Sequence, residues 1–374
     1  MSIPVVDFGV YSLRKEDATD EQLRTLGGEL KRAFSQVGFL FFQNSGISEE
    51  EVERVMETSK RFFLQAEELK KPFTRKSFPN NPNHGWVALE TERLNPSQPG
   101  DLKEAGASGI SEEEVERVME TSKRFFLQAE ELKKPFTRKS FPNNPNHGWV
   151  ALETERLNPS QPGDLKEAFN TASFHPDIKW PSSDAVAGFR EIHTSFFQRC
   201  KELSLRVLRV MALSLDLDPD VFLHAHRFIG TDENGTTLRS LFYPPVKSAM
   251  AKEGQLRCGE HSDYGSITLL FQGSEGLQVC TRSGEFVSVP SVPGAVLVNI
   301  ADLMQRWTSD QLVSVRHRVL LPPVGDSSTR QSLAYFVQPD DEALITCCDG
   351  SDKYPPITGG DYLMQRFSES YAKS

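Results

Sequence analysis

The sequence has few cysteines, and their spacing matches neither of the common cysteine frameworks. Its 374 residues contain five, at positions 200, 258, 280, 347 and 348, and no pair has the CxxC spacing. We therefore expect neither a disulfide framework nor a zinc knuckle. We interpret the adjacent Cys347 and Cys348 as buried thiols, because free cysteine behaves as a small hydrophobic residue.

The sequence also lacks an excess of positive charge and a long apolar run. Its formal net charge is -10, whereas nucleic-acid binding depends on Lys and Arg neutralising phosphates. The first residues, MSIPVVDFGVYSLRKED, show no basic segment followed by an apolar one, and no later stretch approaches the ~20 apolar residues of a membrane span. We expect a cytoplasmic protein that binds neither nucleic acid nor membrane.

An internal duplication interrupts an otherwise ordinary globular composition. Residues 45–105 recur without a substitution at 108–168, a shift of 63 positions. Solenoid repeats are diverged and come in three or more copies, so this is not a repeat architecture. Subtracting one 63-residue unit from 374 leaves 311 residues as the working domain. Either copy, or a splice of the front of the first with the back of the second, could fill the same place in the fold.

Each copy of the duplicated segment begins with a helix signal. Ser48 with Glu51, and Ser111 with Glu114, form the S-x-x-E pattern of a capping box ahead of apolar residues at helical spacing. A lone copy has too little apolar surface to fold by itself. We therefore hypothesise that the unused copy packs loosely on the surface or promotes domain swapping.

The order of elements predicts an α+β fold. Ile3 to Phe8 is a predicted strand, a helix follows from Thr19, and a long helix covers about 183–215. Residues 237–340 are short β-branched and aromatic runs separated by turn residues, which indicates a sandwich or jelly roll. We expect a single domain over 1–374, with an N-terminal region at 1–180 and a long helix and barrel core at 181–374.

Two histidines and an aspartate are the strongest candidates for metal ligands. Side chains alternate along a strand, so His261 and Asp263 are predicted to lie on one strand face, and His317 lies on the apolar face with Val315 and Val319. Two histidines and one carboxylate are the ligand set of non-haem iron(II) oxygenases, which leave open positions for dioxygen and substrates. We predict an Fe(II) site at these three residues.

An arginine thirteen residues after His317 supports this interpretation. Alternation places Arg330, Ser332, Ala334 and Phe336 on one strand face. An inward-facing guanidinium needs an anion, and a carboxylate can meet it with two charge-assisted hydrogen bonds. A dicarboxylate cosubstrate would satisfy it.

With these residues in place, the chain resembles the 2-oxoglutarate and Fe(II)-dependent dioxygenase superfamily, in particular its isopenicillin N synthase-like branch. The resemblance is carried, in order, by IPVVDF, GFLFFQNSGI, LFYPPV, GEHSDYGSITLLFQ, VPGAVLVNIADLMQRWTSD, VRHRV and RQS. It implies a double-stranded β-helix, the jelly-roll core, flanked by helices. It further implies that Arg330 and Ser332 bind the distal carboxylate of 2-oxoglutarate and that Tyr243 donates a hydrogen bond to this cosubstrate.

The resemblance also sets the expected reaction. It implies oxidation of an unactivated C-H bond of a small-molecule metabolite by O2, as hydroxylation, desaturation or ring closure, with release of succinate and CO2 and with ascorbate as a candidate reductant. Candidate substrate contacts are Trp86, Arg93, Trp149, Arg156 and Phe336. The substrate and the oligomeric state stay open.

Two alternatives stay open as well. One is an Fe(II) oxidase of the isopenicillin N synthase type, which uses no 2-oxoacid. The other is an inactive binding or regulatory variant disrupted by the duplication. Four of the six other histidines, at positions 175, 193, 224 and 226, are expected to have core or surface roles.

Overall fold

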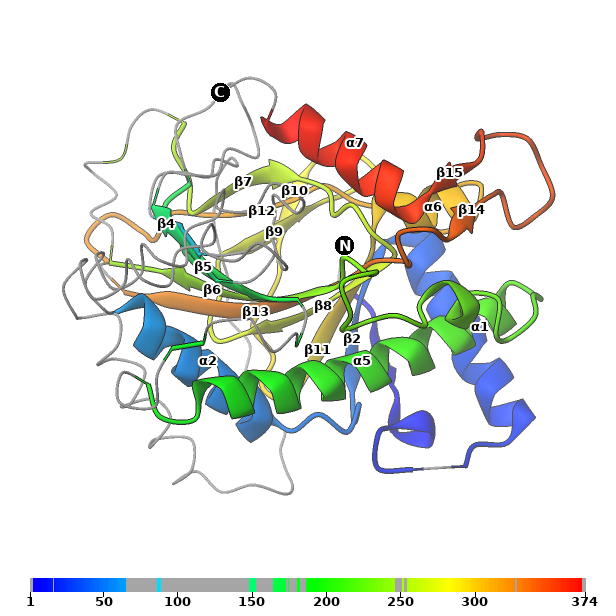
Figure 1. Cartoon of the computed structure of the whole chain (residues 1–374), viewed down its shortest axis with the longest axis horizontal. Coiled ribbons are helices and arrows are strands. Elements are labelled where there is room, and N and C mark those ends of the chain that lie inside the picture. Colours follow the sequence, from blue (N-terminus) through cyan, green and yellow to red (C-terminus); the bar gives the residue numbers. More distant parts are fainter. Residues whose placement is uncertain are drawn as a thin grey trace.

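The protein folds as two facing β-sheets with helices on the outer side of the larger one (Figure 1). The computed structural model describes residues 3–15, 17–64, 86–88, 148–152, 164–172, 174, 180–181, 186–245, 251, 254–326 and 328–371. Within these ranges the helices are α1 (Asp20–Gln36), α2 (Glu49–Phe63), α5 (Phe189–Ser214), α6 (Asp302–Trp307) and α7 (Gly359–Tyr371), with 3-10 turns η1 (Gly9–Tyr11) and η5 (Leu223–Ala225).

The larger sheet contains strands from both halves of the chain. In spatial order these are β1 (Val5–Asp7), β2 (Phe39–Gln43), β11 (Val296–Ile300), β8 (Ile267–Gln272), β13 (Arg330–Val337), β6 (Thr237–Tyr243), β5 (Glu167–Thr171), β3 (Trp86–Ala88) and β4 (Gly148–Leu152). The smaller sheet has the order β10 (Phe286–Ser288), β9 (Leu277–Cys280), β12 (His317–Val319) and β7 (Cys258–His261). A short pair, β14 (Leu344–Ile345) and β15 (Ile357–Thr358), precedes α7. This arrangement agrees with the predicted α+β jelly roll.

The first two long helices begin where the sequence signals place them. Thr19 caps α1 in a capping box with Gln22, and Ser48 caps α2 in a capping box with Glu51. The corresponding signal of the second copy, from Ser111 to Glu114, lies outside the described residues. Helix α5 begins later than predicted, at Phe189, after Gly188 adopts a positive φ of 72°.

Helices α2 and α5 cover the outer face of the larger sheet and leave its inner face to the second sheet (Figure 1). One hydrophobic core fills the space between these helices and the sheet, with Leu203 and Val207 of α5 fully buried in it. A second core lies between the sheets and includes Phe39 and Leu241. Within the described part of the chain, no helix is both long and apolar enough to cross a membrane.

The two copies of the duplicated segment contribute different parts of this fold. Helix α2 and β3 come from the first copy, whereas β4 and the start of β5 come from the second. Val87 in β3 and its duplicate Val150 in β4 are both in register with Ala168 of β5. The described residues therefore form a splice of the two copies, with both copies placed at the same edge of β5.

The five cysteines are free thiols, as expected from their spacing. Four are buried, including Cys347, while Cys348 is half-buried rather than buried as predicted.

Candidate metal centre and cosubstrate pocket

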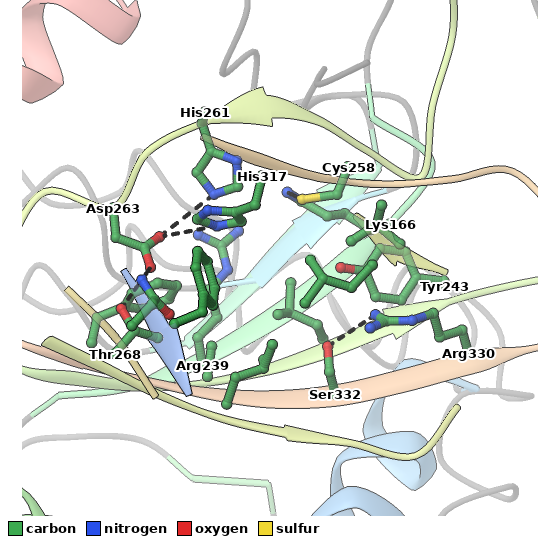
Figure 2. Close-up of a pocket in the computed structure, with 18 residues that line it drawn as sticks. Lys166, Arg239, Tyr243, Cys258, His261, Asp263, Thr268, His317, Arg330 and Ser332 are labelled. Atoms are coloured by element: carbon green, nitrogen blue, oxygen red, sulfur yellow. Dashed lines mark hydrogen bonds and ion pairs between the residues drawn. The ribbon is translucent and has the colours of Figure 1, made fainter. Parts of the chain in front are cut away.

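Three side chains converge between the two sheets. Nε2 of His261 lies 3.6 Å from Oδ1 of Asp263, and Nε2 of His317 lies 3.5 Å from the same oxygen. Each of the three residues offers one ligand atom, and these atoms all lie within 4.8 Å of one another. Among the described residues, this is the group of histidine, cysteine or acidic side chains that is close enough together to hold a metal ion. Figure 2 shows the two imidazole rings and the carboxylate turned toward one another.

Strand register brings the two histidines together. His261 ends β7 and His317 begins β12, and the antiparallel ladder places them directly opposite each other with ring centroids 4.2 Å apart. The prediction that Asp263 shares a strand face with His261 is wrong in detail, because β7 ends at His261. Asp263 instead lies in the β7–β8 loop, where its carbonyl accepts a hydrogen bond from the amide of Asp302.

The two oxygens of the Asp263 carboxylate have different partners. Oδ2 accepts hydrogen bonds from the Thr268 hydroxyl and from Nδ2 of Asn299, each at 2.7 Å. These bonds fix the carboxylate and leave Oδ1 facing the histidines. Thr268 of β8 and Asn299 of β11 are cross-strand partners, so one row of the sheet supplies both donors. Sequence reasoning did not single out either residue.

Each histidine is oriented through its other ring nitrogen. Nδ1 of His261 lies 3.1 Å from the carbonyl of Gly259, and Nδ1 of His317 lies 3.1 Å from the carbonyl of Val315. A carbonyl accepts only, so Nδ1 donates and Nε2 keeps a lone pair toward the centre. Outer hydrogen bonds of this kind are typical of metal-binding histidines.

The electrostatics of the centre favour the metal-binding forms of His261 and Asp263 but the protonated form of His317. Burial, and then the neighbouring His317, lowers the pKa of His261 to about 3, so His261 is neutral. Burial opposes ionisation of Asp263, but the two histidines and Asn299 together hold the pKa of its carboxyl below the usual range. Burial opposes protonation of His317, but the neighbouring Asp263 carboxylate outweighs it and raises the pKa of His317. An ion that binds Nε2 of His317 would therefore displace a proton from it. With both imidazoles neutral, two histidines and one carboxylate oxygen would suit a divalent iron ion.

An arginine lies at the other end of the same cavity, at the right in Figure 2. The side chain of Arg330 is 2% exposed, and it donates to Glu275 O at 2.8 Å, to Gln272 Oε1 at 2.9 Å and to Ser332 Oγ at 3.2 Å. Its guanidinium also lies 4.9 Å from the centroid of the Tyr243 ring. These contacts hold the guanidinium in place, while Ser332 and Tyr243 line the cavity beside it, so the three predicted cosubstrate residues are brought together.

The cavity between the sheets contains about 580 Å³ of empty space when the open solvent at its mouth is included. The residues that line it are Phe39, Lys166, Arg239, Leu241, Tyr243, Cys258, His261, Asp263, Thr268, Leu270, Leu277, Asn299, His317, Val319, Arg330, Ser332, Ala334 and Phe336. Most are buried, so a ligand bound there would be largely removed from water.

Two cationic residues of the lining were missed by the sequence reasoning. Lys166 lies 3.1 Å from Asp164 Oδ2 and 3.0 Å from Cys258 Sγ, and its side chain is almost fully buried. Arg239 is in β6, and period two places it on the face of Leu241 and Tyr243. The signal for Arg239 was therefore present, because the same alternation was applied to Arg330.

The predicted substrate contacts have different outcomes. Phe336 lines the cavity. Trp86 begins β3 and Trp149 lies in β4, while Arg93 and Arg156 lie outside the described residues.

Three of the four histidines expected in core or surface roles lie where such roles would place them. His193 and His226 are fully buried, and His224 is exposed in η5. His175 lies outside the described residues.

Comparison with known proteins places this geometry in a family context. A profile of the 2OG-Fe(II) oxygenase superfamily matches residues 234–339, and a profile described as non-haem dioxygenase in morphine synthesis N-terminal matches twice, at 3–107 and 105–188. The double match follows the duplication.

Similar curated proteins and solved structures cover most of the chain. The proline hydroxylase buaE of Petromyces alliaceus is 31% identical over 70% of this chain and 87% of its own length. The 2-oxoglutarate-Fe(II) type oxidoreductase ppzD of Metarhizium rileyi is 33% identical over 70% of this chain and 80% of its own length. The crystal structure of a full-length Neurospora crassa protein in complex with alpha-KG and thymine has a TM-score of 0.70 and 29% identity, over 99% of this chain and 97% of that one.

Proposed function

Since this chain belongs to the 2OG-Fe(II) oxygenase superfamily, we propose that His261, Asp263 and His317 hold the iron of this enzyme. The superfamily expected from the sequence is confirmed, and the protein is an Fe(II)- and 2-oxoglutarate-dependent oxygenase. Its place in the isopenicillin N synthase-like branch stays a prediction. The observation that carries the iron assignment is the convergence of three ligand atoms within 4.8 Å.

The cosubstrate belongs at the Arg330 end of the cavity. The guanidinium of Arg330 and the hydroxyl of Ser332 are fixed beside each other at 3.2 Å. Charge-assisted hydrogen bonds from such a pair suit the distal carboxylate of 2-oxoglutarate. Tyr243, buried next to the same guanidinium, is the proposed further donor to the cosubstrate.

The chemistry divides between the bound groups and the chain. Fe(II), when bound with 2-oxoglutarate, supplies the activation of O2 that oxidises a C-H bond while succinate and CO2 form. The residues hold the ligand atoms in place, orient the cosubstrate and exclude water. Thr268 and Asn299 keep one oxygen of Asp263 turned toward the centre, so the metal site is shaped before the metal binds.

We infer a small-molecule substrate for this cavity. The cavity is lined by apolar side chains together with a few convergent polar groups, as small-molecule sites usually are, and the similar Neurospora crassa structure contains thymine with alpha-KG. Trp86, Trp149, Arg93, Arg156 and Phe336 stay candidate contacts, ascorbate the candidate reductant and the cytoplasm the predicted compartment.

The test measures metal binding, 2-oxoglutarate binding and succinate release on the same protein. We expect His317→Ala to weaken Fe(II) binding and to abolish succinate release. Arg330→Gln should leave metal affinity unchanged and weaken 2-oxoglutarate binding about tenfold or more, because a charge-assisted pair is lost. Arg190→Gln, on the exposed side of α5, is the control and should change neither.

Two results would contradict the proposal. Metal binding that survives in His317→Ala would place the iron elsewhere. Oxidation of substrate with no succinate would favour the 2-oxoacid-independent oxidase considered above.

A further inference from the structure

The cationic residues of the cavity lie in three different surroundings. Lys166 is ion-paired with Asp164. Arg330 is 2% exposed and donates to three neighbouring groups at the closed end. Arg239, in contrast, is half-buried, and so are Leu270 and Phe336 near it. Of these three cationic side chains, Arg239 is the one that is not fully buried.

Strand register fixes where Arg239 lies relative to the cosubstrate site. In the β6–β13 ladder, Arg330 is opposite Tyr243, Ser332 is opposite Leu241 and Ala334 is opposite Arg239. Arg239 lies four positions before Tyr243 on β6, which corresponds to about 13 Å along the strand. The carboxylate bound by Arg330 and Ser332 is therefore not the group at which Arg239 is aimed. Figure 2 shows Arg239 projecting from the sheet into the space that the iron ligands share.

The neighbours of Arg239 form a compartment of their own. Ala334 of β13 is in register with Arg239 on one side and with Leu270 of β8 on the other. Directly opposed Cβ atoms lie about 5 Å apart. The Arg239 and Leu270 side chains therefore lie on either side of the single methyl group of Ala334. The next cavity-facing residue along β13 is Phe336. The compartment is thus cationic on one side, apolar on the other and deepest in the middle, where the small Ala334 side chain leaves room.

From this geometry we infer that Arg239 binds a carboxylate of the substrate, while Leu270 and Phe336 contact its apolar body over Ala334. The inference rests on the proposed function, because it assigns the substrate class of the same cavity. The planar fork of an arginine matches a carboxylate with two parallel hydrogen bonds. The spacing across Ala334 fits a ring or branched apolar group, so the substrate class is a small carboxylic acid with an apolar body.

Binding to non-reacting protein tests the inference without a known substrate. The protein is loaded with Mn(II) and 2-oxoglutarate, and the binding of benzoate, cyclohexanecarboxylate and pyridine-3-carboxylate is compared with that of their primary amides by calorimetry. We expect at least one acid to bind about tenfold more tightly than its amide. Arg239→Gln should remove this preference, Arg239→Lys should restore part of it, and Arg190→Gln should leave it unchanged.

A merely structural role for Arg239 gives a different pattern. It would lower the melting temperature in Arg239→Gln without changing the ratio of acid to amide affinity. That result, or the absence of any acid that binds the wild-type protein better than its amide, overturns the inference. Loss of 2-oxoglutarate binding in Arg239→Gln as severe as in Arg330→Gln also overturns it. Failure of the wild-type protein to bind 2-oxoglutarate at all would instead contradict the proposed function.

Discussion

Asp263, a proposed iron ligand, has two carboxylate oxygens with different surroundings. One carboxylate oxygen is held by two donors from the sheet, and the other is 3.5 and 3.6 Å from the two histidines. A carboxylate held on one side loses little rotational freedom when its other oxygen binds an ion. The outer donors should therefore contribute to metal affinity although they do not touch the metal.

Thr268→Val tests this contribution. Valine has nearly the same shape as threonine but cannot donate, so Oδ2 of Asp263 keeps Asn299 as its remaining donor. We expect about tenfold weaker Mn(II) binding, measured by titration. Thr308→Val is the matched control, because the buried Thr308 hydroxyl donates to the Met304 carbonyl in α6. Equal metal affinities in the two variants would mean that the hydrogen bond to Asp263 has no role in metal binding.

Residue-level prediction worked where a regular strand positions the side chain. Alternation alone put His317 on an inward face and Arg330 with Ser332 on one face, as the cavity lining has them. It was wrong for Asp263, which lies in a loop whose path depends on distant hydrogen bonds. Arg239 was missed for another reason. Strand alternation places it on the face of Leu241 and Tyr243, but the sequence does not show whether that face lines a cavity or meets solvent.

At the scale of elements, the β7–β8 loop that carries Asp263 packs closely against the end of β13. A Cβ added at Gly265 would lie 2.2 Å from the carbonyl oxygen of Val337 and 2.7 Å from Cδ of Gln338. Any side chain at position 265 would therefore force the backbone of the loop or of Val337 to move. The approach of these two segments therefore requires glycine here.

Gly265→Ala should separate the loop from β13. We expect a loss of about 1–3 kcal/mol in the free energy of unfolding, as for other overpacked sites, together with weaker Mn(II) binding, because Asp263 moves with the loop. Gly28→Ala is the control: an added Cβ in α1 meets nothing within 4 Å, and it should stabilise by about 0.5–1 kcal/mol through helix propensity. Urea unfolding and metal titration measure both effects, and an unchanged Mn(II) affinity in Gly265→Ala would contradict this account.

A buried histidine joins three elements. Nδ1 of His193 in α5 donates to the Phe189 carbonyl at 2.9 Å, and Nε2 faces the hydroxyls of Ser59 in α2 at 2.8 Å and Ser240 in β6 at 3.2 Å. Because Nδ1 carries the proton, Nε2 can accept from a serine hydroxyl in the neutral ring. Burial lowers the pKa of His193 to about 3 from its ordinary value of 6.5.

This shift predicts loss of stability in acid. Below the ordinary histidine pKa the unfolded chain binds a proton that folded His193 does not, so stability falls as the pH drops from about 6.5 toward about 3. One such group contributes up to about 1.4 kcal/mol per pH unit. Urea unfolding at several pH values should show a shallower pH dependence for His193→Gln than for the wild type. The control His224→Gln, at an exposed position, should keep the wild-type slope, and equal slopes in all three proteins would contradict the prediction.

Element-level prediction was better for helix starts marked by side chains than for strand lengths. Thr19 and Ser48 mark the starts of α1 and α2 because their hydroxyls cap free amides. The predicted strand face with Val315, His317 and Val319 requires a strand that begins by Val315, but β12 covers His317–Val319. The length of a strand depends on its partners, here β7 and β9, and a single sequence does not reveal those partners.

At the scale of the whole molecule, the duplication supplies two identical strand segments, β3 and β4, that pair with the same strand, β5. Val87 and Val150 are the same residue in the two copies, and both are in register with Ala168. The N-terminal family profile likewise matches twice. The sequence revealed this ambiguity but could not resolve it, because identical segments have identical local preferences.

Removing one unit should therefore leave the working fold intact. Deletion of residues 65–127 joins the front of the first copy to the back of the second, and any 63-residue deletion within the doubled region gives the same 311-residue chain. It keeps α2, β4 and β5, so we expect unchanged 2-oxoglutarate binding and a melting temperature equal to or above that of the full chain. Deletion of 65–147, which also removes the remaining equivalent of 65–84, is the control and should destabilise the protein. If the 311-residue chain instead melts well below the full chain, both copies contribute to the core and the spare-unit interpretation is wrong.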